Sequence, residues 1–364
     1  MPTPTAAPAS IALGIVGTGR IALSDHLPAL RRIPRWRVAA LCDTDPERLA
    51  RAGEFFPDAT RYADHRALLQ QSGLQALGIL TPPSSHAEIA LHALAAGLHV
   101  LIEKPLAASV AECDALRVAA AAADRVALVG YNTRWHRLAR RARQLLQQGA
   151  VGRVQAIRST YTHRMSARDL PAAGHWHAGD GGLLMLEAPH HYDLWRYLVR
   201  QDVEEVYAAA QPDEGNPAAS ISARLSGGAL VSAIMSAETN ACSEIEVIGD
   251  RGRLLVSFYR ADGLQLYPHT EPPGSLSGRL RRTAALLGEM PQIVGALRRG
   301  GAFRASFGAM WEHYASAIAD GAPVECTLQD GLCALQTAIA VVESASSGLP
   351  VRLIDSASPI ASEE

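Results

Sequence analysis

The stretch "IALGIVGTGRIA", residues 11–22, constrains the fold more than any other part of the sequence. An apolar run before its first glycine predicts a buried strand, and the spacing of the apolar residues after its last glycine predicts a helix. Gly14, Gly17 and Gly19 lie at this junction. They allow a sharp turn and let backbone N–H groups approach a phosphate, whose negative charge the N-terminus of a helix favours. The stretch therefore predicts either a dinucleotide-binding turn or a tight turn without a ligand.

The pattern around this turn continues along the first third of the chain. Strands are expected at 11–17, 37–43, 76–81, 99–103 and 126–131, and helices near 20–32, 45–55, 84–97 and 109–124. This alternation is typical of a doubly wound parallel sheet, the Rossmann arrangement, with helices on both faces.

The pattern changes after residue 150. A helix is expected at 182–199, and it precedes alternating strands joined by short turns: "VEEVYAAA", "AASISARL", "ALVSAIMS", "SEIEVIGD" and "GRLLVSFY". Neighbouring strands with short connections predict a large, mostly antiparallel open sheet. Helices are expected again near 306–320 and 329–347. The expected fold class is therefore α/β, with an N-terminal Rossmann domain and a C-terminal α+β domain.

A chain of 364 residues with 48% hydrophobic content is long enough for two cores. The predicted parts are a tail at 1–10, a dinucleotide-binding domain at 11–132, a C-terminal domain at 133–355 with a crossing helix at 133–149, and a tail at 356–364.

Composition excludes several partners. The formal net charge of -2 provides no field that would attract nucleic acid or an anionic membrane, so neither is expected as a partner. The five cysteines are odd in number and form no CxxC pair, which favours a reducing cytoplasm over a disulfide framework or a zinc knuckle. The sequence shows neither an export signal nor an apolar run of about 18 residues. A cytoplasmic location is expected.

Asp43 ends the strand that follows the glycine-rich turn, within "VAALCDTDPE". A carboxylate there can accept hydrogen bonds from an adenosine ribose and would repel a 2′-phosphate, so NAD is expected as the cofactor in preference to NADP. The alternative is an aspartate that only caps the next helix. The turn residues expected to bind the cofactor are Gly17, Thr18, Gly19, Arg20 and Ile21.

The segment "ILTPPSSHAEIALHALAAGLHVLIEKPLA", residues 79–107, resembles the corresponding segment of the Gfo/Idh/MocA oxidoreductases. The resemblance extends over nearly the whole chain and includes, in the family's order, "GIVGTGRIA", "CDTDPERLA", "VGYNTRWHRL", "QQGAVGRV", "GGLLMLEAPHHYDLWRYL", "EIEVIGDRGRL" and "ESASSGLPVRL".

The resemblance implies the roles of the residues at two strand ends. The residues that it places along the cofactor are Thr81, Pro82 and His86. It places Glu103 near the nicotinamide ribose and Lys104 against the substrate hydroxyl, with a cis peptide before Pro105. A lysine beside the positive nicotinamide has reason to release its proton, because neighbouring positive charge disfavours the ammonium. The alternative for Lys104 is an exposed lysine at a strand end.

A second catalytic stretch follows from the family's His-x-x-Asp element, which matches His190 and Asp193. The resemblance makes His190 the general acid/base and Asp193 a substrate-binding residue. Many relatives have an aspartate one turn before this histidine, and here the position is Leu186. Glu187, about 100° around the helix, can substitute for that carboxylate as the orienting partner of His190 and is expected among the substrate-binding residues. Alternatively it pairs with His191, four residues on, which is expected to be structural.

Further substrate-binding residues are expected in the loop before this helix and at one strand end: Arg164, Trp176, His177 and Asn132. Asn132 is also expected near the cofactor, or it is only a turn residue. The pair His175 and His177 has no third ligand at a familiar spacing, so no metal is expected.

The expected function is an NAD-dependent oxidoreductase that transfers hydride between nicotinamide and a secondary hydroxyl or carbonyl carbon of a sugar, cyclitol or glycoside. Two alternatives stay open. One is a lyase or glycosidase that retains NAD and oxidises its substrate only transiently, and the other is a catalytically silent NAD-binding sensor. Relatives commonly assemble through the sheet of the C-terminal domain, so a homodimer or homotetramer is expected.

Overall fold

The structure is a computed structural model that describes residues 10–164, 182–211, 218–272, 274–298 and 300–353. The chain divides into two compact units. The first unit holds the described residues up to Asn132 together with 304–332, and the second holds the described residues of 133–303 and 333–353. The segment 304–332 had been expected in the C-terminal domain, but it packs with the first unit.

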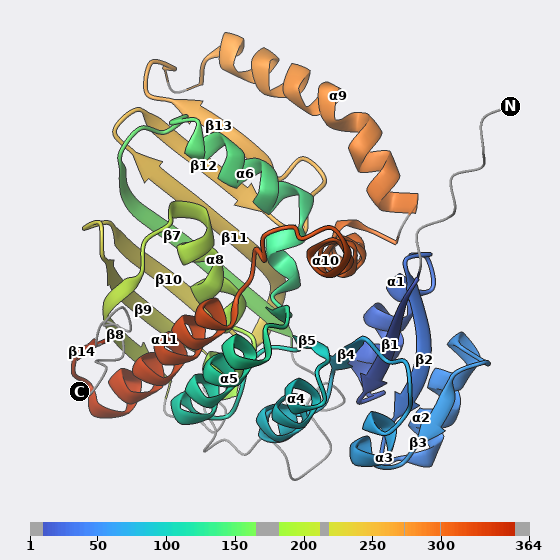
Figure 1. The fold of residues 1–364 in the computed structure, drawn as a ribbon. Coiled ribbons are helices and arrows are strands. Elements are labelled where there is room, and N and C mark those ends of the chain that lie inside the picture. Colours follow the sequence, from blue (N-terminus) through green and yellow to red (C-terminus); the bar gives the residue numbers. More distant parts are fainter. Residues whose placement is uncertain (1–9, 165–181, 212–217, 273, 299, 354–364) are drawn as a thin grey trace, which may run out of the picture. The chain divides into compact units, whose positions relative to one another are not determined.

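The first unit contains a six-stranded sheet in the order β3-β2-β1-β4-β5-β6, with every neighbouring pair parallel (Figure 1). Its strands are β1 (Ile11–Val16), β2 (Trp36–Cys42), β3 (Thr60–Tyr62), β4 (Ala76–Ile79), β5 (His99–Ile102) and β6 (Ala127–Val129). This is the Rossmann order, in which ligands bind at the carboxyl ends of the strands beside the point where the order reverses. The expected Rossmann sheet is confirmed. Sequence analysis missed β3, whose three residues have no apolar run.

The helical segments of this unit are η1 (Ala22–His26), α1 (Leu27–Leu30), α2 (Pro46–Phe55), α3 (His65–Leu69), η2 (Pro83–Ser85), α4 (His86–Ala95) and α5 (Val110–Ala123), with most of α10 (Ala302–Ala319). Local capping explains where two of them begin. The Asp45 side chain accepts hydrogen bonds from two backbone N–H groups at the start of α2, and Ser109 forms a capping box with Glu112 at the start of α5.

The helix after the glycine turn contains a π turn, η1. Pro28 has no N–H with which to reach the carbonyl of Ser24, four residues earlier, and its ring would crowd that carbonyl. The N–H of Leu27 instead bonds to the carbonyl of Ala22, five residues earlier. The proline therefore explains the wider turn, which places His26 on the buried side of the helix.

Trp311 explains why residues from 304 onward join the first unit. Its ring packs over β4 at Gly78, where an added Cβ would lie 2.8 Å from the Trp311 ring. Trp36 donates its indole N–H to the Trp311 carbonyl at 3.0 Å, and the two rings pack edge to face. All of Trp311 is buried, so α10 completes the core of this unit.

The second unit contains an eight-stranded sheet in the order β13-β12-β11-β7-β10-β9-β8-β14 (Figure 1). Its strands are β7 (Val154–Arg164), β8 (Val203–Ala210), β9 (Ala218–Leu225), β10 (Leu230–Ser236), β11 (Glu238–Gly249), β12 (Gly252–Ser257), β13 (Leu264–Pro268) and β14 (Val351–Arg352). β7 and β10 pair in parallel and the other neighbours are antiparallel. The expected mostly antiparallel sheet is therefore confirmed.

The main helices of this unit are α6 (Arg137–Gln147), α7 (Gly182–Leu186), α8 (Pro189–Val199), α9 (Leu276–Arg298) and most of α11 (Leu328–Ser347), and a 3₁₀ turn, η3 (Asn132–Trp135), precedes α6. The single helix expected at 182–199 is wrong. Pro189 cannot donate a backbone hydrogen bond, so α7 ends at Leu186 and α8 starts afresh at Pro189. In the described part of the chain, helices long and apolar enough to cross a bilayer are absent.

Candidate active site

Gly17 and Gly19 play different parts in the turn after β1. Gly17 has a φ of +91°, and a Cβ on it would lie 2.6 Å from the backbone of Leu80. Only glycine fits there. Among the residues that the structure describes, only the chain neighbours of Gly19 come within 4 Å of a Cβ placed on it, so the space above it is open at the start of the helix. Gly14 had been expected to contribute to the turn, but it lies inside β1, where a Cβ would crowd the Leu77 side chain at 2.9 Å.

Asp43 holds this turn in place from the end of β2. One of its carboxylate oxygens accepts hydrogen bonds from the backbone N–H of Thr18 at 2.7 Å and from the Thr18 hydroxyl at 3.0 Å. The other oxygen accepts the N–H of Asp45 at 2.9 Å. A carboxylate has about four lone-pair sites, so these three bonds leave room for a ribose hydroxyl. Asp43 therefore shapes the turn in addition to the expected ribose contact.

His86 joins the ends of β4 and β5. It is buried, with Nδ1 2.9 Å from the carbonyl oxygen of Pro105 and Nε2 2.7 Å from that of Thr81. Burial lowers the pKa of His86 despite these carbonyl contacts, which favour the charged form. The imidazole fixes the Thr81-Pro82 turn against the Lys104-Pro105 peptide, which is cis as the resemblance implies.

Glu103 is held by a buried histidine that sequence analysis did not single out. The Nε2 atom of His26 lies 3.0 Å from one Glu103 oxygen, and the indole N–H of Trp311 donates to Nδ1 of His26 at 3.1 Å. Because indole nitrogen only donates, Nδ1 must accept, and Nε2 carries the proton given to Glu103. The chain Trp311–His26–Glu103 thus orients a carboxylate at the end of β5.

The second Glu103 oxygen accepts the backbone N–H of Lys104 at 3.0 Å. Burial alone would raise the pKa of Glu103, but the hydrogen bond from His26 and the charge of Lys104 outweigh it and hold that pKa below its ordinary value. Glu103 is therefore ionised near neutral pH. Gly130, after β6, leaves the room that this carboxylate needs, because a Cβ there would lie 2.9 Å from it.

Lys104 is half-buried at the end of β5, and it is the only lysine in a chain with 34 basic residues of the lysine or arginine type. Asn132, after β6, is buried and donates its side-chain amide to the Ser306 hydroxyl at 2.8 Å. This bond favours a positioning role for Asn132 over a simple turn residue.

In the second unit, His190 lies at the second position of α8. Its Nδ1 atom is 3.5 Å from the Thr133 hydroxyl, and the side chain is half-buried. Leu186 is the last residue of α7, and a two-residue turn, 187–188, separates it from α8.

Asp193 has a different role from the substrate contact expected of it. It is fully buried, and its two oxygens accept a bidentate pair of hydrogen bonds from Arg134, at 2.8 Å for the Nε atom. Arg134 also lies over the ring of Tyr197. Buried bidentate pairs of this kind fix geometry, so Asp193 anchors α8 to the 3₁₀ turn that carries Thr133.

His191 is structural, as expected, but Glu187 is not its partner. His191 is buried, with Nδ1 2.7 Å from the Ser159 hydroxyl and Nε2 3.0 Å from the Ser243 hydroxyl, which leaves neither nitrogen for Glu187. Burial lowers the pKa of His191 to about 3, so the ring is neutral. Glu187 instead accepts the hydroxyl of Tyr161 at 3.3 Å.

The remaining predicted residues lie partly beyond what the structure describes. Arg164 is the exposed last residue of β7. Trp176 and His177, like His175, lie outside the described residues.

Comparison with known proteins decides the family. Residues 11–131 match an oxidoreductase family with an NAD-binding Rossmann fold, Gfo/Idh/MocA, and residues 139–255 match the C-terminal domain of the same family. The chain belongs to the Gfo/Idh/MocA family.

Individual relatives of this family are distant. The chain is 26% identical over 196 residues to the myo-inositol 2-dehydrogenase of Thermotoga maritima. The aligned residues make up 54% of this chain and 57% of that protein. It is 32% identical over 200 residues to the levoglucosan dehydrogenase of Pseudarthrobacter phenanthrenivorans, 51% of this chain and 50% of that protein. The chain thus spans about half the length of the curated relatives it matches.

Among solved structures, the WlbA dehydrogenase of Bordetella pertussis in complex with NADH and UDP-GlcNAcA has the same fold. The TM-score is 0.79 at 23% identity, over 95% of this chain and 99% of that chain.

The first unit of this Gfo/Idh/MocA protein fits a dinucleotide. The open space at Gly19, the lone-pair site left on Asp43 and the ionised Glu103 all lie at the carboxyl ends of strands in one parallel sheet. This edge is where the Rossmann fold binds its ligands.

Proposed function

We propose that this chain is an NAD-dependent oxidoreductase acting on a secondary hydroxyl or carbonyl of a sugar, cyclitol or glycoside. The observation that carries the proposal is the position of its only lysine. Arginine serves wherever else a basic side chain is used, yet lysine stands at the end of β5, beside the buried Glu103. Arginine cannot release a proton at neutral pH, whereas a lysine amine can, so proton transfer explains the exception.

NAD supplies the hydride acceptor when it is bound. The residues that would hold it are Gly17, Thr18, Gly19, Arg20 and Ile21 in the turn, Asp43 at the adenosine ribose, Thr81 and Pro82 after β4, and Glu103 near the nicotinamide ribose. His86 and Asn132 act as positioning residues in this proposal, because their side-chain nitrogens already contact the protein. The fixed carboxylate of Asp43 favours NAD over NADP.

Lys104 and His190 act on the hydroxyl proton of the substrate. Lys104 accepts a hydrogen bond from the hydroxyl and takes part in removing its proton as the carbinol carbon is oxidised. His190 is the general acid/base, with its ring oriented by Thr133. Glu187 and Arg164 are proposed to contact other substrate hydroxyls, as are Trp176 and His177.

The substrate class rests on the relatives. Relatives in sequence include proteins named as dehydrogenases of inositol, levoglucosan and apiose. We extend this class to the present chain. A cytoplasmic location belongs to the same proposal, supported by five cysteines that the structure shows as free thiols.

We also propose a homodimer or homotetramer. On the outward face of the second unit's sheet, Tyr207, Leu230 and Ile234 are about half exposed, although they are large and apolar. Exposed large apolar side chains on one sheet face are suited to contact with a second copy of the chain.

The direct test is anaerobic NADH formation with a panel of sugars, cyclitols, glycosides and sugar acids. Wild-type protein should reduce NAD with at least one member, and Lys104→Arg should bind NAD but lose about 10²–10⁴-fold in kcat, since it keeps the charge and cannot transfer the proton. Unchanged turnover in Lys104→Ala would overturn the catalytic role. Bond cleavage without NADH would favour the NAD-retaining lyase or glycosidase, and binding without any turnover would favour the sensor.

The single lysine permits a readout that does not need turnover. An amine-reactive reagent should label Lys104 and the N-terminal amine, and NAD together with a substrate should slow labelling at Lys104 only. The N-terminal amine is the internal control. Equal labelling of Lys104 with and without ligands would show that this side chain does not face them.

A further inference from the structure

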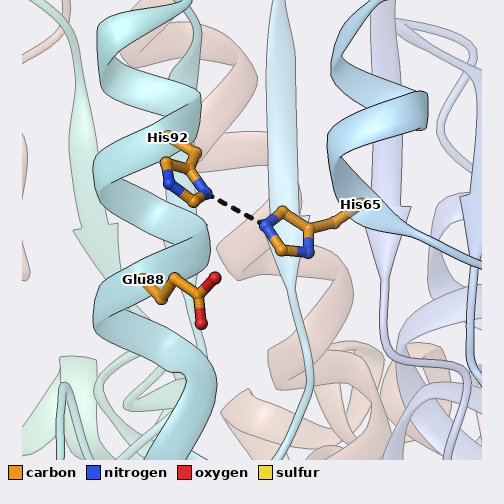
Figure 2. A group of neighbouring side chains, drawn as sticks. All are labelled: His65, Glu88 and His92. Carbon is orange, nitrogen blue, oxygen red and sulfur yellow. Dashed lines mark hydrogen bonds between the residues drawn. The ribbon is translucent and has the colours of Figure 1, made fainter.

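A cluster of three possible metal ligands lies on the surface of the first unit, on two helices that follow β3 and β4. It consists of His65 at the start of α3, and of Glu88 and His92 on α4 (Figure 2). One ligand atom from each side chain lies within 4.8 Å of the others. Nothing in the proposed oxidoreductase chemistry uses these residues.

The two imidazoles already have nearly the spacing of a shared ion. The Nε2 atom of His65 and the Nδ1 atom of His92 are 3.1 Å apart, and the ring planes are 15° from parallel. Two nitrogens on a tetrahedral zinc ion, each about 2.0–2.1 Å from it, are roughly 3.3–3.4 Å apart. A shift of a few tenths of an ångström, with a small rotation of each ring, would therefore replace the hydrogen bond by a bridging ion.

Glu88 is correctly placed to supply the third ligand. It precedes His92 by four residues on the same helix, so both side chains project from one face of α4 toward His65. Its carboxylate now contacts Arg66. Both partners are more than half exposed, and exposed ion pairs of this kind contribute little, so a cation can displace the arginine.

The surroundings of His65 suit a metal ligand. Its second nitrogen, Nδ1, lies 3.5 Å from a carboxylate oxygen of Asp64, the arrangement by which outer carboxylates orient metal-binding histidines. The same oxygen caps α3 by accepting the N–H of Arg66 at 3.1 Å, which fixes its position.

We propose that His65, Glu88 and His92 form a zinc site in which water completes the coordination. Two imidazoles and one carboxylate are ligands that suit Zn²⁺, whereas Mg²⁺ and Ca²⁺ prefer oxygen. The ion joins α3 to α4. Since α3 follows β3, which pairs with the end of β2 at Cys42, it also ties down the edge of the sheet next to Asp43.

The experiment is a zinc titration of tag-free, chelator-treated protein in competition with a chromophoric chelator. Wild type should bind one tight equivalent. His65→Gln and His92→Gln should each weaken that binding at least about tenfold, and Asp64→Asn, which keeps the helix cap but loses the charge, by a similar factor. Cobalt in place of zinc should give the visible absorption of a tetrahedral ion in wild type. The double variant His65→Gln/His92→Gln should lose this absorption.

Arg66→Gln gives the sharpest test, because the proposal predicts a gain. Removing the arginine frees Glu88, so zinc should bind several-fold more tightly, and the gain in affinity should shrink as the salt concentration is raised.

Two control variants change histidines outside the cluster. They are His269→Gln, at an exposed position of the second unit, and the double variant His175→Gln/His177→Gln, and both should leave the tight equivalent of zinc unchanged. No bound equivalent in the micromolar range, or equal affinity in the His65→Gln/His92→Gln double variant, would overturn the site. The titration measures no turnover, so its result is independent of the oxidoreductase proposal.

Discussion

Gly17 and Gly19 stand two residues apart, yet a side chain would meet different surroundings at each. At Gly17 the positive φ and the backbone of Leu80 both forbid a Cβ. At Gly19 the described residues other than its chain neighbours place no atom within 4 Å of the position a Cβ would take. We expect a bound ligand, not the protein, to exclude a side chain there.

The matched substitutions separate these reasons. Gly17→Ala should destabilise the protein by about 1–3 kcal/mol, because it combines backbone strain with overpacking. Gly19→Ala should leave the free energy of unfolding unchanged or raise it slightly, but should weaken NAD binding at least tenfold. Urea unfolding and an NAD titration by fluorescence measure the two effects. A Gly19→Ala protein with wild-type NAD affinity would show that the open space does not hold the pyrophosphate.

Hydrogen bonds that join distant residues could not be predicted from sequence. The roles of Asp43 and of the glycine turn were predicted from sequence because each directly follows a predicted strand of the Rossmann pattern. His26 was not, since the indole that fixes its tautomer belongs to Trp311, 285 residues away. The same limit applies to Asp193, whose place in a helical His-x-x-Asp pattern gives no sign of its buried pairing with Arg134.

Helix α8 is joined to the sheet of the second unit by His191, which bridges Ser159 on β7 and Ser243 on β11. The neutral ring needs one donor and one acceptor, and two hydroxyls supply them. The folded pKa of about 3 lies below the ordinary value of 6.5. As the pH falls below about 6.5 the unfolded chain takes up the proton first, so stability declines and levels off only near pH 3.

This linkage predicts a loss of about 2 kcal/mol from His191 between pH 6.5 and pH 5. His191→Gln, which cannot titrate, should show a correspondingly smaller fall in the midpoint of urea unfolding over that range, even if its stability at pH 7 is lower. His269→Gln, an exposed control, should keep the wild-type fall. A wild-type pH dependence in His191→Gln would mean that the buried ring is not the group responsible.

Helices and strands whose apolar residues recur at a regular spacing were predicted well. Short strands that form only because they pair with a neighbouring strand were not. The strands "VEEVYAAA" and "AASISARL" coincide with β8 and β9, because alternate residues are buried along both. The short edge strands β3 and β14 have no such period and owe their existence to the strands they pair with. The helix expected at 182–199 failed at Pro189, where a missing N–H outweighs the apolar pattern.

The residues proposed to bind the cofactor belong to the first compact unit, and the proposed acid/base His190 belongs to the second. The first is closed by a segment from late in the chain, 304–332, so neither unit is continuous in sequence. Composition could not predict this, because Trp311 looks like any other apolar position on a helix. Truncation at residue 132 would remove Trp311 and leave His26 without the indole N–H that it accepts.

The outward face of the second unit's sheet carries the last prediction. Ile234 is opposite Ser220 and Tyr207 is opposite Ser222, so small hydroxyls separate large apolar side chains that are 48% and 45% exposed. In an isologous contact each copy would bury this same patch, and stable contacts of this kind bury about 1,200–2,000 Å² in total. A lysine at its centre would meet the same lysine of the other copy or force its charge into an apolar contact, at a cost of several kcal/mol.

Ile234→Lys should therefore yield a folded monomer by light scattering. The control Val118→Lys, at an exposed position on α5 in the first unit, should keep the wild-type mass. If Ile234→Lys keeps the mass of an oligomeric wild type, the contact lies elsewhere, and a monomeric wild type would remove the proposal altogether.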